Sequence, residues 1–84
     1  MIIHPTVNIN GTSAKKLLEQ QMVVKRAAYR LIQELTASTP HGRDYLNDDE
    51  YKIARNDHIR RISQVSDVYN DAESLSLKLA DKVD

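Results

Sequence analysis

Apolar residues recur at helical spacing over two long stretches of the chain. In residues 12–37, one row of apolar positions has heptad-like spacing and a second row runs beside it. The first row consists of Leu17, Val24, Ala28, Leu31 and Leu35. The second row consists of Leu18, Met22, Tyr29 and Ile32. Because residues three or four apart share one face of an α-helix, residues 12–37 are predicted to form a helix with a wide apolar face.

Residues 48–81 are predicted to form a second helix, roughly 45 Å long. Asn47 stands at the N-cap with Glu50 three residues later, as in a capping box, and Leu46 and Tyr51 stand at the two positions of a hydrophobic staple. No Gly or Pro interrupts this stretch. Its main apolar row consists of Tyr51, Ala54, Ile62, Val65, Tyr69, Ala72 and Leu79.

The segment before the first helix, residues 1–11, is expected to be an extended arm. Apolar and polar residues alternate in it, and Pro5 lies among them, which suits an edge segment better than a helix. The arm ends in a turn that places Thr12 or Ser13 at the N-cap of the first helix.

Residues 38–47 are expected to be the loop that joins the two helices into an antiparallel hairpin. Pro40 lacks a backbone donor and Gly42 permits a left-handed backbone, so both favour the end of a helix. Because the second helix is longer, its C-terminal turns are expected to lack a partner within the hairpin, and the arm is placed to cover them. Residues 74–79 alternate strictly and leave open a short strand beside the arm, although their good helix formers favour a helix.

The length of the chain predicts self-association. At 84 residues, a single domain buries a small share of the surface that its unfolded chain exposes. With no Cys and only three His, neither disulfides nor a structural zinc ion are expected to stabilise it. The predicted fold class is therefore all-α: an antiparallel hairpin of two long helices with an extended N-terminal arm, assembled as a homo-oligomeric helical bundle.

The charge balance argues against several classes of partner. Twelve basic and twelve acidic residues cancel to a net charge of +0, so general binding to nucleic acids or to anionic membranes is not expected. The N-terminus lacks the basic and apolar regions of a secretory signal, and no apolar run approaches membrane-spanning length. A cytoplasmic protein is expected.

The residues most suggestive of a site stand in the loop and on the first turns of the second helix. They are Arg43, Asp44, Tyr45, Tyr51, Arg55, His58 and Arg61. Tyr51, Arg55 and His58 follow one another at steps of four and three residues, so they share a helix face with the apolar row. A guanidinium or imidazole on a packing face costs free energy unless it is paired or meets a ligand.

Two interpretations of this cluster remain open on the sequence alone. In the first, Asp44 pairs with Arg55 or Arg61, His58 bonds a loop carbonyl, and the cluster fixes the bend of the hairpin. In the second, the three arginines bind a phosphate or carboxylate while a nearby tyrosine stacks on a planar ring, as for a nucleotide. The paired or open state of the arginines distinguishes the two.

Catalysis and metal binding are not expected. His4, His41 and His58 are far apart in the sequence, and no His-x-x-x-His or Glu-x-x-His pair occurs. His41 or His58 beside Asp44 would make an acid–base pair, but a thin hairpin offers little room to exclude water. No cofactor is expected.

Three features taken together resemble small two-helix proteins of phages and prophages. They are Asn10-Gly11-Thr12-Ser13 before the first helix, Pro40-His41-Gly42-Arg43-Asp44-Tyr45 in the loop, and Ala54-Arg55, His58 and Arg61 on the second helix. This resemblance covers nearly the whole chain and implies no particular activity. Residues 48–57 also resemble the second-helix pattern of phage anti-CBASS sponges, which sequester cyclic oligonucleotide signals of the host.

The second resemblance implies a homo-oligomer that binds a cyclic nucleotide between subunits without cleaving it, with Tyr51 and Arg55 at matching positions. The arm and the long second helix depart from the sponge pattern. The function predicted first is a non-enzymatic phage-type accessory or anti-defence protein that sequesters a nucleotide-like anion. The alternatives are a protein–protein inhibitor or adaptor that binds a host protein through its apolar helix face, and a purely structural helical subunit.

Overall fold

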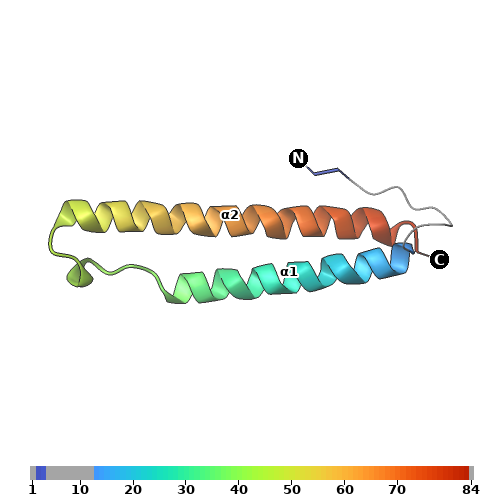
Figure 1. Ribbon diagram of the computed structural model, residues 1–84, viewed down its shortest axis with the longest axis horizontal. Helices are drawn as coiled ribbons and strands as arrows, with labels where there is room; N and C mark the ends of the chain where they lie inside the picture. Colours follow the sequence, from blue (N-terminus) through green and yellow to red (C-terminus); the bar gives the residue numbers. More distant parts are fainter. Residues whose placement is uncertain (1, 4–12, 84) are drawn as a thin grey trace.

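The computed structural model is an antiparallel pair of long helices joined at one end (Figure 1). It describes residues 2–3 and 13–83. In chain order the elements are α1 (Ala14–Ala37), the short 3-10 helix η1 (Gly42–Asp44) and α2 (Asp48–Ala80). The principal extents are 60 × 21 × 17 Å, so the molecule is a rod about two helices wide. The predicted all-α hairpin is confirmed for the part of the chain that is described.

Helix α1 begins after Ser13, one of the two residues predicted as its cap. The hydroxyl oxygen of Ser13 accepts the backbone N–H of Lys16 at 3.2 Å. The helix ends at Ala37, as predicted, and the backbone N–H of Ser38 donates to carbonyl oxygens of the last turn. The predicted start at residue 12 lies outside the described residues.

Helix α2 also begins after a side-chain cap. The side-chain oxygen of Asn47 accepts the backbone N–H of Glu50 at 2.8 Å, which confirms the predicted N-cap. Three acidic residues occupy the first turn, where negative charge complements the positive end of the helix dipole. The predicted hydrophobic staple is wrong, because Leu46 is 96% exposed and so has almost no contact with Tyr51.

The C-terminal third of α2 is helical without interruption. The helix ends at Ala80, one residue before the predicted end, so residues 74–79 do not form the alternative strand. Ser76 fits the helix by donating its hydroxyl to the carbonyl oxygen of Ala72 at 2.8 Å. The good helix formers of this segment therefore outweigh its alternating pattern.

The two helices pack along a seam with a thin core. Among the described residues, the buried side chains are Ala14, Ala28 and Leu35 on α1, and His58, Ala72, Leu75 and Leu79 on α2. Three of these are alanines, which let the helices approach closely but bury little apolar area. The fully buried part of the core is therefore small, and many apolar side chains of both helices remain partly or largely exposed.

The seam uses a different side of α1 from the one that the heptad pattern predicts. Val24 and Leu31 are 40% and 48% exposed, although the pattern places both in the seam. Gln21 and Lys25 are half-buried instead. The aliphatic stem of a lysine packs well against neighbouring side chains while its ammonium stays near water. Because α1 is apolar on several sides, periodicity alone does not single out the packed one.

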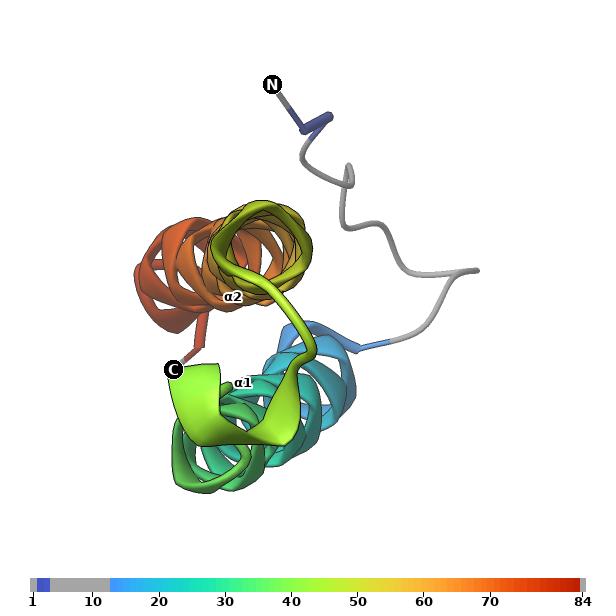
Figure 2. The same cartoon turned by 90° about the vertical axis from the view of Figure 1, so that its left-hand side faces the viewer.

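Helix α2 is the longer helix, with 33 residues against 24 in α1, and its surplus lies at the N-terminal end. Figure 1 shows α1 beginning beside the last turns of α2, where Leu79 is 1% exposed. Figure 2, seen from the loop end, shows the loop crossing from α1 to the first turns of α2. The prediction that the C-terminal turns lack a partner is therefore wrong. The arm predicted over them lies almost wholly outside the described residues.

Candidate functional site

The predicted loop cluster is divided between packed aromatic side chains and exposed charges. The rings of Tyr45 and Tyr51 lie together, with centroids 6.1 Å apart and planes tilted by 54°. Gly42 lies beside the ring of Tyr51, since a Cβ added at Gly42 would be 4.0 Å from Cγ of Tyr51. Tyr45 thus packs on α2, as the interpretation that the cluster fixes the bend requires. These contacts hold the loop against the overhanging turns of α2.

His58 is the buried polar residue of the described chain, with 7% of its surface exposed. Its Nε2 lies 3.4 Å from Oγ1 of Thr39, just beyond the end of α1. Thr39 donates its hydroxyl proton to the carbonyl oxygen of Thr36 at 2.6 Å. The same oxygen is therefore left to accept the Nε2–H of His58, in place of the predicted bond to a loop carbonyl. His58 links α2 to the end of α1.

The three arginines of the predicted cluster are exposed. Neither Arg43, Arg55 nor Arg61 forms an ion pair or side-chain hydrogen bond with another described residue, and the same holds for Asp44. Within the described chain, the predicted pairing of Asp44 with an arginine is therefore wrong. Arg55 and Arg61 lie about 120° apart around α2, so they point to different sides of the rod.

The predicted place of Arg55 on the packing face is also wrong. Arg55 is exposed although it shares a helix face with the buried His58. His58 stands beside Thr39, just beyond the end of α1, so Arg55, about one turn nearer the loop, lies past the end of α1. The desolvation argument that singled it out therefore applies only to His58.

A groove opens between the two helices away from the loop. Its volume is about 660 Å³, within the range typical of binding sites. Its α1 wall consists of Leu18, Met22, Lys25, Arg26 and Tyr29. Its α2 wall consists of Tyr69, Glu73, Ser76, Leu77 and Ala80. We call this side of the hairpin the groove face; it carries the exposed apolar side chains of Met22, Tyr29 and Leu77.

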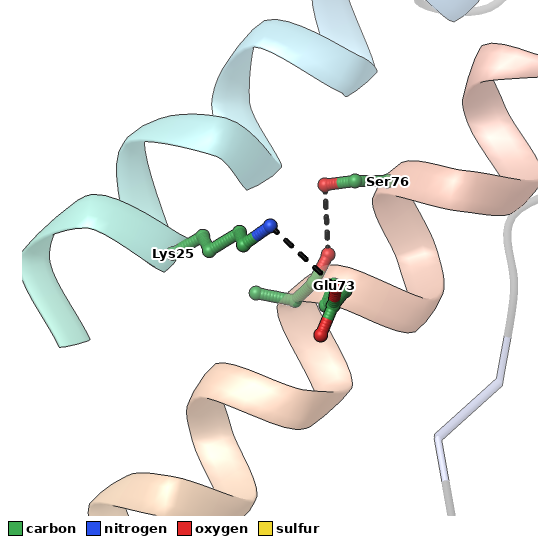
Figure 3. A network of polar contacts seen from close by, with 4 residues as sticks. Lys25, Glu73 and Ser76 are labelled. Atoms are coloured by element: carbon green, nitrogen blue, oxygen red, sulfur yellow. Dashed lines mark hydrogen bonds and ion pairs between the residues drawn. The ribbon is translucent and has the colours of Figure 1, made fainter. Parts of the chain in front are cut away.

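Lys25 lies in the groove and contacts two residues of α2. Its Nζ is 3.8 Å from Oε1 of Glu73 (Figure 3) and 5.4 Å from the centroid of the Tyr69 ring. The ring of Tyr69 in turn lies 6.3 Å from that of Tyr29. The Lys25 and Glu73 side chains are 32% and 46% exposed, so water screens the ion pair and its contribution is at most about 1 kcal/mol. The pair orients Lys25 more than it stabilises the fold.

The sequence predicted the apolar part of this groove but not its charged pair. Leu18, Met22 and Tyr29 belong to the second apolar row of the first predicted helix. Lys25 and Glu73 stand among interleaved charges of both signs, a pattern that is typical of a solvated helix face. The available signal was the position of Lys25 three residues before Ala28, which places it at the edge of the seam.

The described residues show few other candidate sites. No three His, Asp or Glu among them lie close enough together to hold a metal ion. None of the helices in the described ranges is both long and apolar enough to cross a membrane. Comparison of the chain with protein-family models, with curated proteins and with solved structures finds no match. The function therefore has to be inferred from the chain's own geometry.

Proposed function

We propose that this protein is a non-catalytic binding protein that takes up a helical segment of polypeptide on its groove face. The observation that carries the proposal is a groove of about 660 Å³ beside the exposed side chains of Met22, Tyr29 and Leu77. Contiguous apolar side chains of this kind in water usually mark an interaction surface. An amphipathic helix covers such a surface with its own residues at steps of three and four.

The polar groups of the groove suit a polypeptide better than a small anion. Lys25 is already held by Glu73 and by the ring of Tyr69, so its charge is partly neutralised within the chain. Arg26 lines the groove as an exposed cation with no ion pair among the described residues. A helix that presents one acidic side chain beside an apolar row would pair with Arg26 and cover the apolar walls together.

The geometry around His58 supports a binding role over catalysis. The hydroxyl that contacts its imidazole, that of Thr39, already donates its proton to the carbonyl oxygen of Thr36. An imidazole activates a hydroxyl nucleophile by accepting that proton, so this pair is arranged for structure.

Photo-crosslinking tests the proposal directly. A benzoylphenylalanine residue placed at Met22 or at Leu77, in cells that produce the full chain, is expected to form adducts with a polypeptide on irradiation. Gln20 is the control position, because it is exposed and lies two residues before Met22, which places it about 160° away around α1. The absence of adducts from both groove positions, or equal adducts from position 20, would contradict the proposal.

A second candidate function has one specific observation in its favour. Arg43, Arg55 and Arg61 form no ion pair or side-chain hydrogen bond with another described residue, which is the state that the ligand-binding interpretation requires. In this candidate the protein is a phage-type anti-defence homo-oligomer that sequesters a cyclic oligonucleotide at its loop end. A bound ligand at 100 times its dissociation constant adds about 2.7 kcal/mol to the free energy of unfolding, which a thermal-shift screen detects.

The screen would use purified protein with cyclic and linear di- and trinucleotides. The candidate expects a shift with one cyclic species that Arg55→Ala removes. The matched control is Arg60→Ala, because Arg60 is an exposed arginine that contacts Asp57 on the same helix. If none of these nucleotides shifts the transition, the arginines are ordinary surface residues.

A further inference from the structure

We propose that the occupant of the groove face is a second copy of this chain, related by a two-fold axis parallel to the helices, so that two hairpins form a four-helix bundle. This inference rests on the proposed function and names the partner. In the bundle, α1 of each copy lies against α2 of the other, and all neighbouring helices are antiparallel.

The hairpin has a thin core. Three of the seven buried side chains in the described chain are alanines, whereas Met22, Tyr29 and Leu77 remain 46%, 54% and 65% exposed. A hairpin that buries so little apolar area gains little stability from its own seam. A partner that must be present wherever the chain is folded is most simply the chain itself.

The face of one hairpin is large enough to form a stable dimer interface. Helix α1 has 24 residues and is therefore about 36 Å long, and two helices side by side are about 20 Å wide. The face of the hairpin thus measures about 700 Å², close to the roughly 800 Å² that each partner contributes to a standard stable interface. A whole face against a whole face provides the area of a stable dimer.

The charges on the two walls of the groove are complementary. The α1 wall of the groove carries Lys25 and Arg26, and the α2 wall carries Glu73. Lys25 and Glu73 stand level with each other along the rod, since their charged atoms are 3.8 Å apart. A two-fold axis parallel to the helices keeps every residue at its level. It therefore brings the basic wall of each copy opposite the acidic wall of the other, with Arg26 facing the second copy's Glu73.

Two matched substitutions test which face associates. Met22 on the groove face and Leu31 on the other side of the seam are almost equally exposed, at 46% and 48%. In sedimentation equilibrium, the wild type is expected at twice its 9.6 kDa chain mass. Met22→Asp is expected to weaken the dimer at least 100-fold, and Leu31→Asp is expected to leave it intact.

A monomeric wild type, or a dimer lost in Leu31→Asp and kept in Met22→Asp, would overturn the inference. If Met22→Asp loses its helical circular dichroism along with the dimer, the variant no longer separates folding from association. The wild type then tests the inference, because the Tm of a dimer is expected to rise with protein concentration. A concentration-independent Tm overturns the inference. If the wild type is monomeric but a crosslinking probe at position 22 still captures another polypeptide, the partner is not a second copy of the chain. That result overturns this inference and leaves the proposed function intact.

The direction of the axis has its own test. The chain has no Cys, so Leu46→Cys, at a 96% exposed loop position, carries one spin label per chain. With the axis parallel to the helices both loops lie at one end, and the two labels are expected within about 30 Å, roughly three helix diameters. A separation near 50 Å or more, the length of α2, would place the loops at opposite ends and overturn this arrangement.

Discussion

The ammonium nitrogen of Lys25 lies 5.4 Å from the centre of the Tyr69 ring, between the two helices. The attraction of a cation to an aromatic ring contributes about 0.5–1 kcal/mol at an exposed site. The same ring contacts Tyr29 across the groove. Tyr69 therefore connects the charged and the aromatic parts of the groove face.

Removal of this ring is expected to destabilise the protein. Tyr69→Ala loses the half-buried ring and both of its ring contacts, and is expected to lower the free energy of unfolding by about 2 kcal/mol. Tyr69→Phe is the control, because the hydroxyl forms no hydrogen bond with another described residue, and it is expected to change stability by less than about 0.5 kcal/mol. Urea unfolding followed by circular dichroism at fixed protein concentration measures both. Equal losses in the two variants would contradict the assignment to the ring.

His58→Leu is expected to leave the protein at least as stable as the wild type. The imidazole is buried with one long hydrogen bond, to a hydroxyl that keeps its bond to Thr36 when the imidazole is removed. Thr39 is exposed, so water can replace the imidazole at its hydroxyl oxygen, and an apolar side chain of similar size at position 58 is expected to be neutral or to stabilise by about 1 kcal/mol. The measurement is the Tm by circular dichroism. A loss above about 2 kcal/mol would mean that the bond to Thr39 is essential to the bend.

At the start of α2 the structure has the predicted N-cap at Asn47 but lacks the predicted hydrophobic staple at Leu46. Asn47→Ala removes the acceptor of the Glu50 N–H and is expected to lower the free energy of unfolding by about 1 kcal/mol. Leu46→Ala is the control, since Leu46 is 96% exposed, and is expected to change stability by less than about 0.5 kcal/mol. Thermal unfolding of the two variants side by side measures the difference. A larger loss in Leu46→Ala would restore the hydrophobic staple that the structure lacks.

Gly42→Ala is expected to be tolerated. No described glycine has positive φ, so Gly42 does not use the left-handed backbone that its position in the loop suggested. An added Cβ would meet Cγ of Tyr51 at 4.0 Å, an ordinary van der Waals contact. The substitution is expected to stabilise the protein by about 0.4–1 kcal/mol, because it restricts the unfolded chain. A lowered Tm would show that the loop needs the freedom of glycine.

The ends of the helices were predictable because they depend on local chemistry. Ser13 and Asn47 each accept the backbone N–H of the third residue of the helix that follows, and side chains that do this are identifiable in the sequence. The packing register of α1 was not predictable in the same way. Val24 and Leu31 compete with Gln21 and Lys25 for the seam, and the position of α2 decides between them.

The candidate site was predictable only where it depends on the pattern along a single helix. The row of Leu18, Met22 and Tyr29 was recognisable as a second apolar surface, and it forms one wall of the groove. The exposure of Arg55 depends on where α1 ends relative to the first turns of α2. The spacing of residues along α2 alone does not determine this. Likewise, the pairing of Lys25 with Glu73 joins residues distant in sequence and requires the hairpin register.

The central claim, that the groove face is covered, has a direct test in thiol chemistry. The chain has no Cys, so Met22→Cys and Leu31→Cys each introduce a single thiol at sites that are 46% and 48% exposed in the isolated chain. The measurement is the rate of reaction of each purified variant with a thiol reagent such as Ellman's reagent. A covered groove predicts a rate at position 22 at least ten times lower than at position 31, with the difference disappearing on dilution. Equal rates at high protein concentration would contradict the account.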